Sequence, residues 1–161
     1  MTVIQKYNSV LLVVVVLITV ANIVLTGSKK QPISTISANQ IESIEIHTGL
    51  KQMAFKKSGN LWTLVDDEKA SIDPGKINKL LELLDTHSFR QFENTPDNRE
   101  AFELEDSKNY YLFNNSNITF GTLDPVDQHR YILINDQIHL ITDYYYQFLL
   151  ADKAFFTETS E

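Results

Sequence analysis

Histidine and carboxylate side chains are the groups in this chain that could bind a metal ion or transfer protons. No two of the four histidines have the short helical spacing that places two ligands on one face, and the chain has no cysteine. Carboxylates cluster at 66–68 and at Glu103, Glu105 and Asp106. Two carboxylates can cleave a glycosidic bond when they lie about 5 to 9.5 Å apart. Acidic runs of this kind, however, are typical of solvated turns.

The sequence also lacks the motifs of common enzyme sites. It has no G-x-S-x-G nucleophile elbow, Walker loop or G-x-G-x-x-G, and its five glycines offer little material for a phosphate-binding loop. We therefore expect a protein that is not an enzyme and that has no metal or cofactor. A hydrolase built on the carboxylate clusters is the catalytic alternative, because a site assembled from distant residues leaves no motif.

Aromatic residues gather toward the C-terminus, where 12 of the 17 lie beyond residue 100. Tyr144, Tyr145 and Tyr146 are consecutive, and successive helical residues point about 100° apart, so at least one should be exposed. An exposed tyrosine suits a protein interface or stacking on a sugar ring. The three are therefore candidates for binding a partner or ligand. The alternative is that two pack in the core and the third is tolerated at the surface.

Arg130 and Tyr131 complete the set of candidate binding residues. Asp124 and Asp127 lie a few residues before Arg130. Their proximity favours a structural role for Arg130, an ion pair that fixes a turn, over direct contact with a ligand.

The N-terminal residues predict a membrane anchor. Residues 7–28 carry no charge, and 10–25 are apolar except for one Thr and one Asn. As a helix rising about 1.5 Å per residue, the segment approaches the roughly 30 Å hydrocarbon core of a bilayer. The apolar run is longer than that of a signal peptide, and Thr26-Gly27-Ser28 is a poor cleavage site, which favours an uncleaved signal-anchor. We predict that residues 9–28 cross the cytoplasmic membrane once and that the lipid bilayer is a partner there.

The residues after the anchor are strongly acidic. Positions 31–161 hold 11 basic and 21 acidic side chains, a formal charge of −10. This charge argues against nucleic acid as a partner, because phosphate binding requires clustered cations. It also favours a periplasmic domain, since the cytoplasmic leaflet is anionic. Lysines flank the anchor on both sides, so the positive-inside rule leaves the orientation open.

Elements that would position the candidate residues follow from the apolar patterns. A tail (1–8), the anchor (9–28) and a polar stalk (29–39) precede a domain (40–152) and a C-terminal tail (153–161). Alternation and turn residues predict antiparallel meanders, each followed by a packed helix, an α+β fold. Strands are expected near 41–46, 53–55, 61–65, 88–92, 110–113, 118–120, 131–134 and 138–141, and helices after the caps Asp73 and Thr95 and over 144–150.

This layout resembles the DUF4340 family of bacterial membrane-anchored proteins over roughly residues 36–150. In the first half the resemblance rests on Ile41-Glu42-Ser43-Ile44-Glu45-Ile46, Gly59-Asn60-Leu61-Trp62 and Ile72-Asp73-Pro74. In the second half it rests on Ile118-Thr119-Phe120-Gly121, Leu123-Asp124, His129-Arg130-Tyr131 and Ile138-His139-Leu140-Ile141 leading into Asp143-Tyr144-Tyr145. Where the family has a Gly-Leu-acidic run followed by Pro, this chain has Phe102-Glu103-Leu104-Glu105-Asp106, so we expect a differently shaped loop.

The resemblance implies a role at the bacterial envelope, since such proteins are often associated with ABC-type transport or gliding-type export systems, and it supplies no catalytic residues. We expect a single-pass, membrane-anchored accessory protein whose extracytoplasmic domain binds envelope membrane proteins. The alternative is a module that binds envelope glycan or a small solute. The sequence leaves the identity of the partner or ligand and the oligomeric state open.

Overall fold

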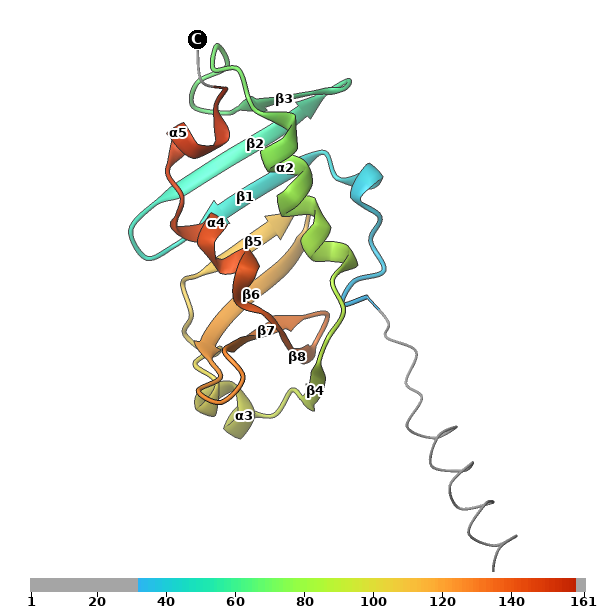
Figure 1. The fold of residues 1–161 in the computed structure, drawn as a ribbon, viewed down its shortest axis with the longest axis vertical. Coiled ribbons are helices and arrows are strands. Elements are labelled where there is room, and N and C mark those ends of the chain that lie inside the picture. The colour runs from blue at the N-terminus through green and yellow to red at the C-terminus, as the bar shows by residue number, and fades with distance from the viewer. Residues whose placement is uncertain (1–31, 159–161) are drawn as a thin grey trace, which may run out of the picture. The chain divides into compact units, whose positions relative to one another are not determined.

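The computed structural model describes residues 32–158, so the predicted anchor at 9–28 lies outside the described residues. Within residues 32–158, none of the helices has the length and apolar character needed to span a membrane. This part of the chain forms one antiparallel sheet of eight strands with short helices, which confirms the α+β class (Figure 1). The strands are β1 (Ser43–His47), β2 (Gln52–Ser58), β3 (Leu61–Leu64), β4 (Arg90–Glu93), β5 (Tyr110–Phe113), β6 (Ser116–Leu123), β7 (His129–Ile134) and β8 (Gln137–Thr142).

The two predicted meanders are joined into one sheet. β1 lies antiparallel beside β5, with Ile46 opposite Tyr111, so the strand order is β3-β2-β1-β5-β6-β7-β8-β4. β4 follows the first meander in the chain but pairs with β8 at the far edge of the sheet. The β7–β8 hairpin turns at Asn135 and Asp136, which have φ of 49° and 62°. Two left-handed residues match the right-handed twist of the flanking strands, even without glycine.

Helices begin at the predicted caps. α2 (Pro74–Leu81) starts after Asp73, whose carboxylate accepts a 2.8 Å hydrogen bond from the N–H of Gly75. α3 (Pro96–Ala101) starts after Thr95, whose hydroxyl accepts from the N–H of Asn98. In both cases proline occupies the first turn, where no N–H is needed. The predicted helix over 144–150 is divided into a 3-10 turn (Asp143–Tyr145) and α4 (Tyr146–Leu150), and a further short helix, α5 (Lys153–Phe156), follows it.

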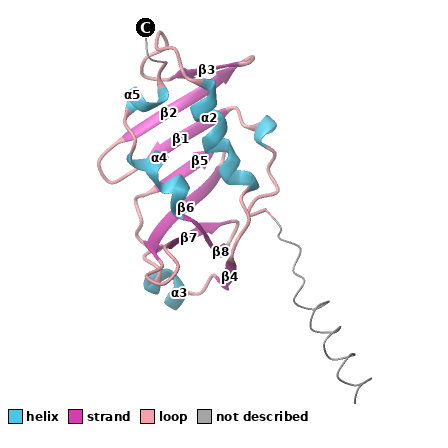
Figure 2. Cartoon of the chain, viewed as in Figure 1, coloured by secondary structure: helices cyan, strands magenta, loops and turns pink. Residues whose placement is uncertain are grey.

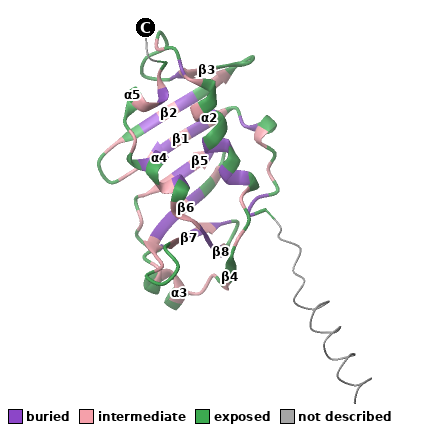
Figure 3. Ribbon diagram, viewed as in Figure 1, coloured by how far each residue is buried: buried purple, intermediate pink, exposed green. Residues whose placement is uncertain are grey.

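The main core lies between one face of the sheet and the helices α2, α4 and α5, which all cross that face (Figures 1 and 2). Ile77 and Leu80, three positions apart on one face of α2, are fully buried in the same core as strand residues such as Phe55 and Phe113 (Figure 3). A second, smaller core lies on the opposite face around Tyr131, and it includes Leu104 from the segment after α3.

The domain is wider than the sequence boundaries predicted. Ile33, placed in the stalk, is 4% exposed, and its N–H donates a 2.8 Å hydrogen bond to the carbonyl of Thr86. Phe156, placed in the C-terminal tail, is fully buried in the main core. The predictions of a stalk up to 39 and a tail from 153 are therefore wrong at these positions, because isolated apolar side chains in polar segments give no periodic signal.

His139 of β8 gives the domain a pH-dependent stability. It is 5% exposed, its Nδ1 makes no hydrogen bond within the described residues, and burial lowers its pKa below the usual 6.5. The unfolded chain therefore binds a proton more readily than the folded one. We expect full stability above about pH 6.5 and a loss of at most about 1.4 kcal/mol per pH unit as the pH falls toward the lowered folded pKa.

Urea unfolding between neutral pH and about pH 5 measures this effect, with His139→Gln as the comparison because its amide does not titrate. The variant should lose less stability on acidification than the native chain. Equal pH dependence in both chains would show that His139 is not the group responsible.

Candidate functional site

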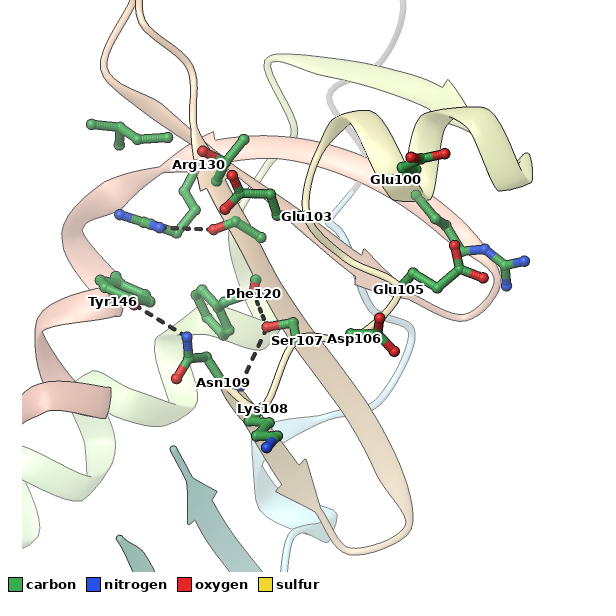
Figure 4. A pocket seen from close by; sticks show the side chains of 14 residues that line it. Glu100, Glu103, Glu105, Asp106, Ser107, Lys108, Asn109, Phe120, Arg130 and Tyr146 are labelled. Atoms are coloured by element: carbon green, nitrogen blue, oxygen red, sulfur yellow. Dashed lines mark hydrogen bonds between the residues drawn. The ribbon is translucent and has the colours of Figure 1, made fainter. Parts of the chain in front are cut away.

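A cavity of about 790 Å³ lies where β6 meets the segment after α3 and the start of α4 (Figure 4). Its side chains come from four parts of the chain that are far apart in the sequence. They are Arg99, Glu100, Glu103, Glu105, Asp106, Ser107, Lys108 and Asn109, then Phe120, Gly121, Thr122 and Leu123, and finally Arg130 and Tyr146. We call this the Arg130 cavity.

Arg130 is held in a fixed position at this cavity. Its Nε donates to the carboxylate of Asp143, its Nη1 donates a 2.8 Å hydrogen bond to the carbonyl of Gly121, and its guanidinium lies 3.6 Å from the ring centre of Tyr146. The predicted ion pair of Arg130 is confirmed, but its predicted partners, Asp124 and Asp127, are wrong, because the partner is Asp143. Arg130 lies opposite Ile141 in the β7–β8 ladder, so its side chain reaches Asp143 just past the end of β8.

The three consecutive tyrosines have three different environments. Tyr144 is 43% exposed, which confirms the prediction that at least one of the three tyrosines reaches the surface. Tyr145 is buried, and its hydroxyl and that of Thr86 are 2.7 Å apart and hydrogen-bonded, so its role is in the core. Tyr146 lines the Arg130 cavity, where its hydroxyl accepts a hydrogen bond from Asn109.

Tyr131 does not join this site. Strand neighbours point to opposite faces of a sheet, so Arg130 faces α4 while Tyr131 enters the second core and stacks on Phe102 with ring centres 3.9 Å apart. Its hydroxyl donates to Asp124 at 3.2 Å. Burial, followed by the negative charge of Asp124, raises the pKa of Tyr131. The structure therefore brings together two of the five candidate residues, Arg130 and Tyr146.

Polar residues between α3 and β5 belong to the site but were not predicted. Ser107 donates a hydrogen bond to the carbonyl of Phe120, and this bond fixes the segment beside β6. The carboxylates of Glu105 and Asp106 project from the same segment, on the other side of the cavity from Tyr146 (Figure 4). The carboxylate cluster was visible in the sequence, but its proximity to Arg130 depends on the tertiary fold.

Gly121 allows the backbone to approach closely at the cavity wall. The β6–β7 register shifts between Phe120 and Leu123, and within this bulge the N–H of Thr122 donates to the carbonyl of Phe102. A Cβ on Gly121 would lie 2.1 Å from that carbonyl oxygen. No side chain fits at this distance, so a bulge glycine is required here.

Glu103 has the backbone conformation expected of glycine. Its φ is 56°, and it follows α3 with the two hydrogen bonds of a Schellman motif, from Leu104 N–H to Arg99 O (2.8 Å) and from Glu103 N–H to Glu100 O (3.1 Å). Glu103 is therefore a left-handed residue that carries a carboxylate at the cavity rim.

The Arg130 cavity offers groups for recognition by charge and hydrogen bonds. Its four carboxylates belong to exposed residues, and no histidine lines it. Across residues 32–158, no group of three His, Asp or Glu side chains is placed to hold a metal ion. Arg130 and Tyr146 offer a fixed cationic and aromatic wall, and the acidic rim opposite attracts positive charge.

Replacement of Gly121 tests the bulge. Gly121→Ala should lower the free energy of unfolding by about 2 kcal/mol or more, because the Phe102 carbonyl or the bulge must move. Urea unfolding measures this free energy. Gly49→Ala is the control, because the atom nearest to the new Cβ at position 49 would lie 4.0 Å away. Similar losses in the two variants would contradict the proposed close approach.

Replacement of Glu103 tests the left-handed position. Glu103→Gly should raise the free energy of unfolding by up to about 1 kcal/mol, because glycine adopts this conformation without steric cost. Glu105→Gly, at a neighbouring position without a positive φ, should lower it instead. Thermal and urea unfolding compare the two variants, and a destabilised Glu103→Gly would refute the assignment.

Comparison with known proteins gives one match at the level of a family. The sequence model described as "Domain of unknown function (DUF4340)" matches residues 62–160, which include the predicted motifs from Ile72-Asp73-Pro74 to Asp143-Tyr144-Tyr145. The match begins within β3, so the predicted motif at 41–46 and residues 59–61 of the next motif lie before it. No curated protein and no solved structure matches the chain. Because the family model covers more than half of the sequence, the chain belongs to the DUF4340 family.

Proposed function

We propose that this protein is a non-catalytic accessory subunit of the bacterial envelope, anchored in the cytoplasmic membrane by residues 9–28, whose periplasmic domain binds a membrane transport or export protein. The apolar N-terminal segment supports the anchor. The Arg130 cavity supports the binding role, because it is a large recessed surface with fixed polar groups.

Charge indicates the chemistry of the partner. Arg130 is neutralised by Asp143, and the remaining charged lining holds four carboxylates against two cations. The carboxylates are those of Glu100, Glu103, Glu105 and Asp106, and the cations are Arg99 and Lys108. The residues after the anchor have a formal charge of −10. A segment of the partner that contains Lys or Arg therefore fits this cavity, with its cations at the rim.

A second candidate function is binding of an envelope glycan or a small solute in the same cavity. One observation favours it. Arg130 uses two of its five N–H donors in the contacts to Asp143 and Gly121, which leaves three for a ligand.

Site-specific crosslinking in cells tests the accessory role. A photoreactive amino acid at Glu103, in the tagged full-length chain, should crosslink to an envelope transport or export protein that is recovered from the membrane in mild detergent and identified by mass spectrometry. The same amino acid at Leu61, which is 73% exposed on the edge strand β3, is the matched control. We expect a product at Glu103 that is absent at Leu61.

Charge reversal completes this test. Glu105→Lys together with Asp106→Lys should reduce the yield of the crosslinked product about tenfold or more, because each like-charge contact disfavours a basic partner. The substitutions lie at exposed positions, so the fold should be retained. Equal crosslinking at Glu103 and Leu61, or an unchanged yield after charge reversal, would refute docking at this cavity.

A further inference from the structure

The chain enters the folded domain almost directly after the proposed anchor. Pro32 forms an isolated antiparallel bridge with His87, and Ile33 is buried. Only three residues, 29–31, therefore lie between this bridge and the anchor proposed at 9–28. An extended chain spans at most about 3.6 Å per residue, so Pro32 lies within about 14 Å of the end of that anchor. The part of the domain around this bridge is thus held close to the bilayer.

Phe89 is an exposed aromatic side chain near this point of entry. It lies two residues after His87, just before β4. Bridged residues are about 5 Å apart and an extended chain rises about 3.4 Å per residue, so Phe89 lies within about 12 Å of Pro32. Phe89 is 60% exposed, although its ring is stacked on that of His129 with ring centres 3.9 Å apart. The stacking fixes an apolar ring at the surface of the domain.

The residues on either side of Phe89 carry no negative charge. Residues 86–92 include Arg90 and no carboxylate, and the nearest acidic residues along the chain are Asp85 and Glu93. Arg90 is exposed, and a guanidinium is a good donor to phosphate oxygens. The residues after the anchor have a formal charge of −10, so anionic headgroups repel most of the domain. A segment without carboxylates meets the least repulsion there.

We propose that the domain rests on the bilayer through Phe89 and Arg90, with the Phe89 ring in the headgroup region and the Arg90 guanidinium on a lipid phosphate. Phenylalanine and cationic side chains are typical of surfaces that lie in this region of a membrane. Lipid is the favoured occupant over a protein, because the short connection to the anchor brings the bilayer to this position in every molecule. The inference rests on the anchor in the function proposed above.

This contact also orients the sheet. β4 and β3 are its two edge strands, and α3 lies at the same end of the sheet as β4 (Figure 1). Contact at Phe89 therefore brings α3 close to the bilayer and leaves β3 far from it. Glu100 of α3 lines the Arg130 cavity, so the contact places that cavity within reach of a membrane protein.

Fluorescence quenching in lipid vesicles tests the contact. The chain has no cysteine, so one introduced cysteine can carry a single NBD fluorophore. Full-length Phe89→Cys, labelled and reconstituted in phosphatidylcholine and phosphatidylglycerol, is compared with Leu61→Cys, which is 73% exposed on the opposite edge strand β3. Lipids with a nitroxide near the headgroup quench only fluorophores in contact with the bilayer. We expect the label at 89 to lose most of its emission and the label at 61 to lose almost none.

A second label tests the role of the native Phe89 ring. Gln91→Cys, at an exposed position of β4, carries the fluorophore while Phe89 is intact. We expect quenching at this position, and Phe89→Asp in the same chain should reduce it, because a carboxylate does not enter the headgroup region readily. Urea unfolding confirms that each variant is folded.

Flotation of the vesicles separates this inference from the proposed function. A chain that does not float with the vesicles would refute the anchor, and the contact with it. Three results with a floating chain would refute the contact alone. They are equally weak quenching at 89 and 61, a blue-shifted but unquenched label at 89, which indicates cover by protein, and quenching at 91 that Phe89→Asp leaves unchanged. Loss of crosslinking at Glu103 with quenching at 89 intact would refute the accessory role and leave the contact standing.

Discussion

The close contact between the Phe102 carbonyl and the β6 bulge at Gly121 is the constraint on which the site depends. The Thr122 N–H donates to that carbonyl, which fixes the segment after α3 beside the sheet. The Gly121 carbonyl accepts from Arg130, and Arg130 lies over Tyr146 of α4. One backbone approach thus connects four elements that are far apart in sequence, and the absence of a side chain at Gly121 makes it possible.

Packing on both faces of the sheet also stabilises the site. One face is covered by α2, α4 and α5, and Phe102 and Leu104 from the end of α3 pack on the opposite face over β4, β7 and β8. Alternation along β7 sends Arg130 to the first face and Tyr131 to the second. The segment that carries the rim carboxylates is therefore anchored by apolar burial on one side of the sheet while its polar residues border a cavity on the other.

The charges around the Arg130 cavity are set by one fixed ion pair and an exposed rim. Asp143 neutralises Arg130, which is held in place at the cavity wall. The remaining charged lining consists of four carboxylates and the two cations Arg99 and Lys108. The carboxylates are therefore in excess, and the local potential favours positive groups.

The sequence by itself determined the features that depend on neighbours in the chain. Residues within a few positions of one another determine where the helices begin, after Asp73 and Thr95. They also determine the strand periodicity and the match to the family. The tertiary structure decided which tyrosine is buried and that Arg130 pairs with Asp143. These outcomes depend on the pairing of strands distant in sequence, which brings together side chains whose spacing along the chain carries no record of their contact.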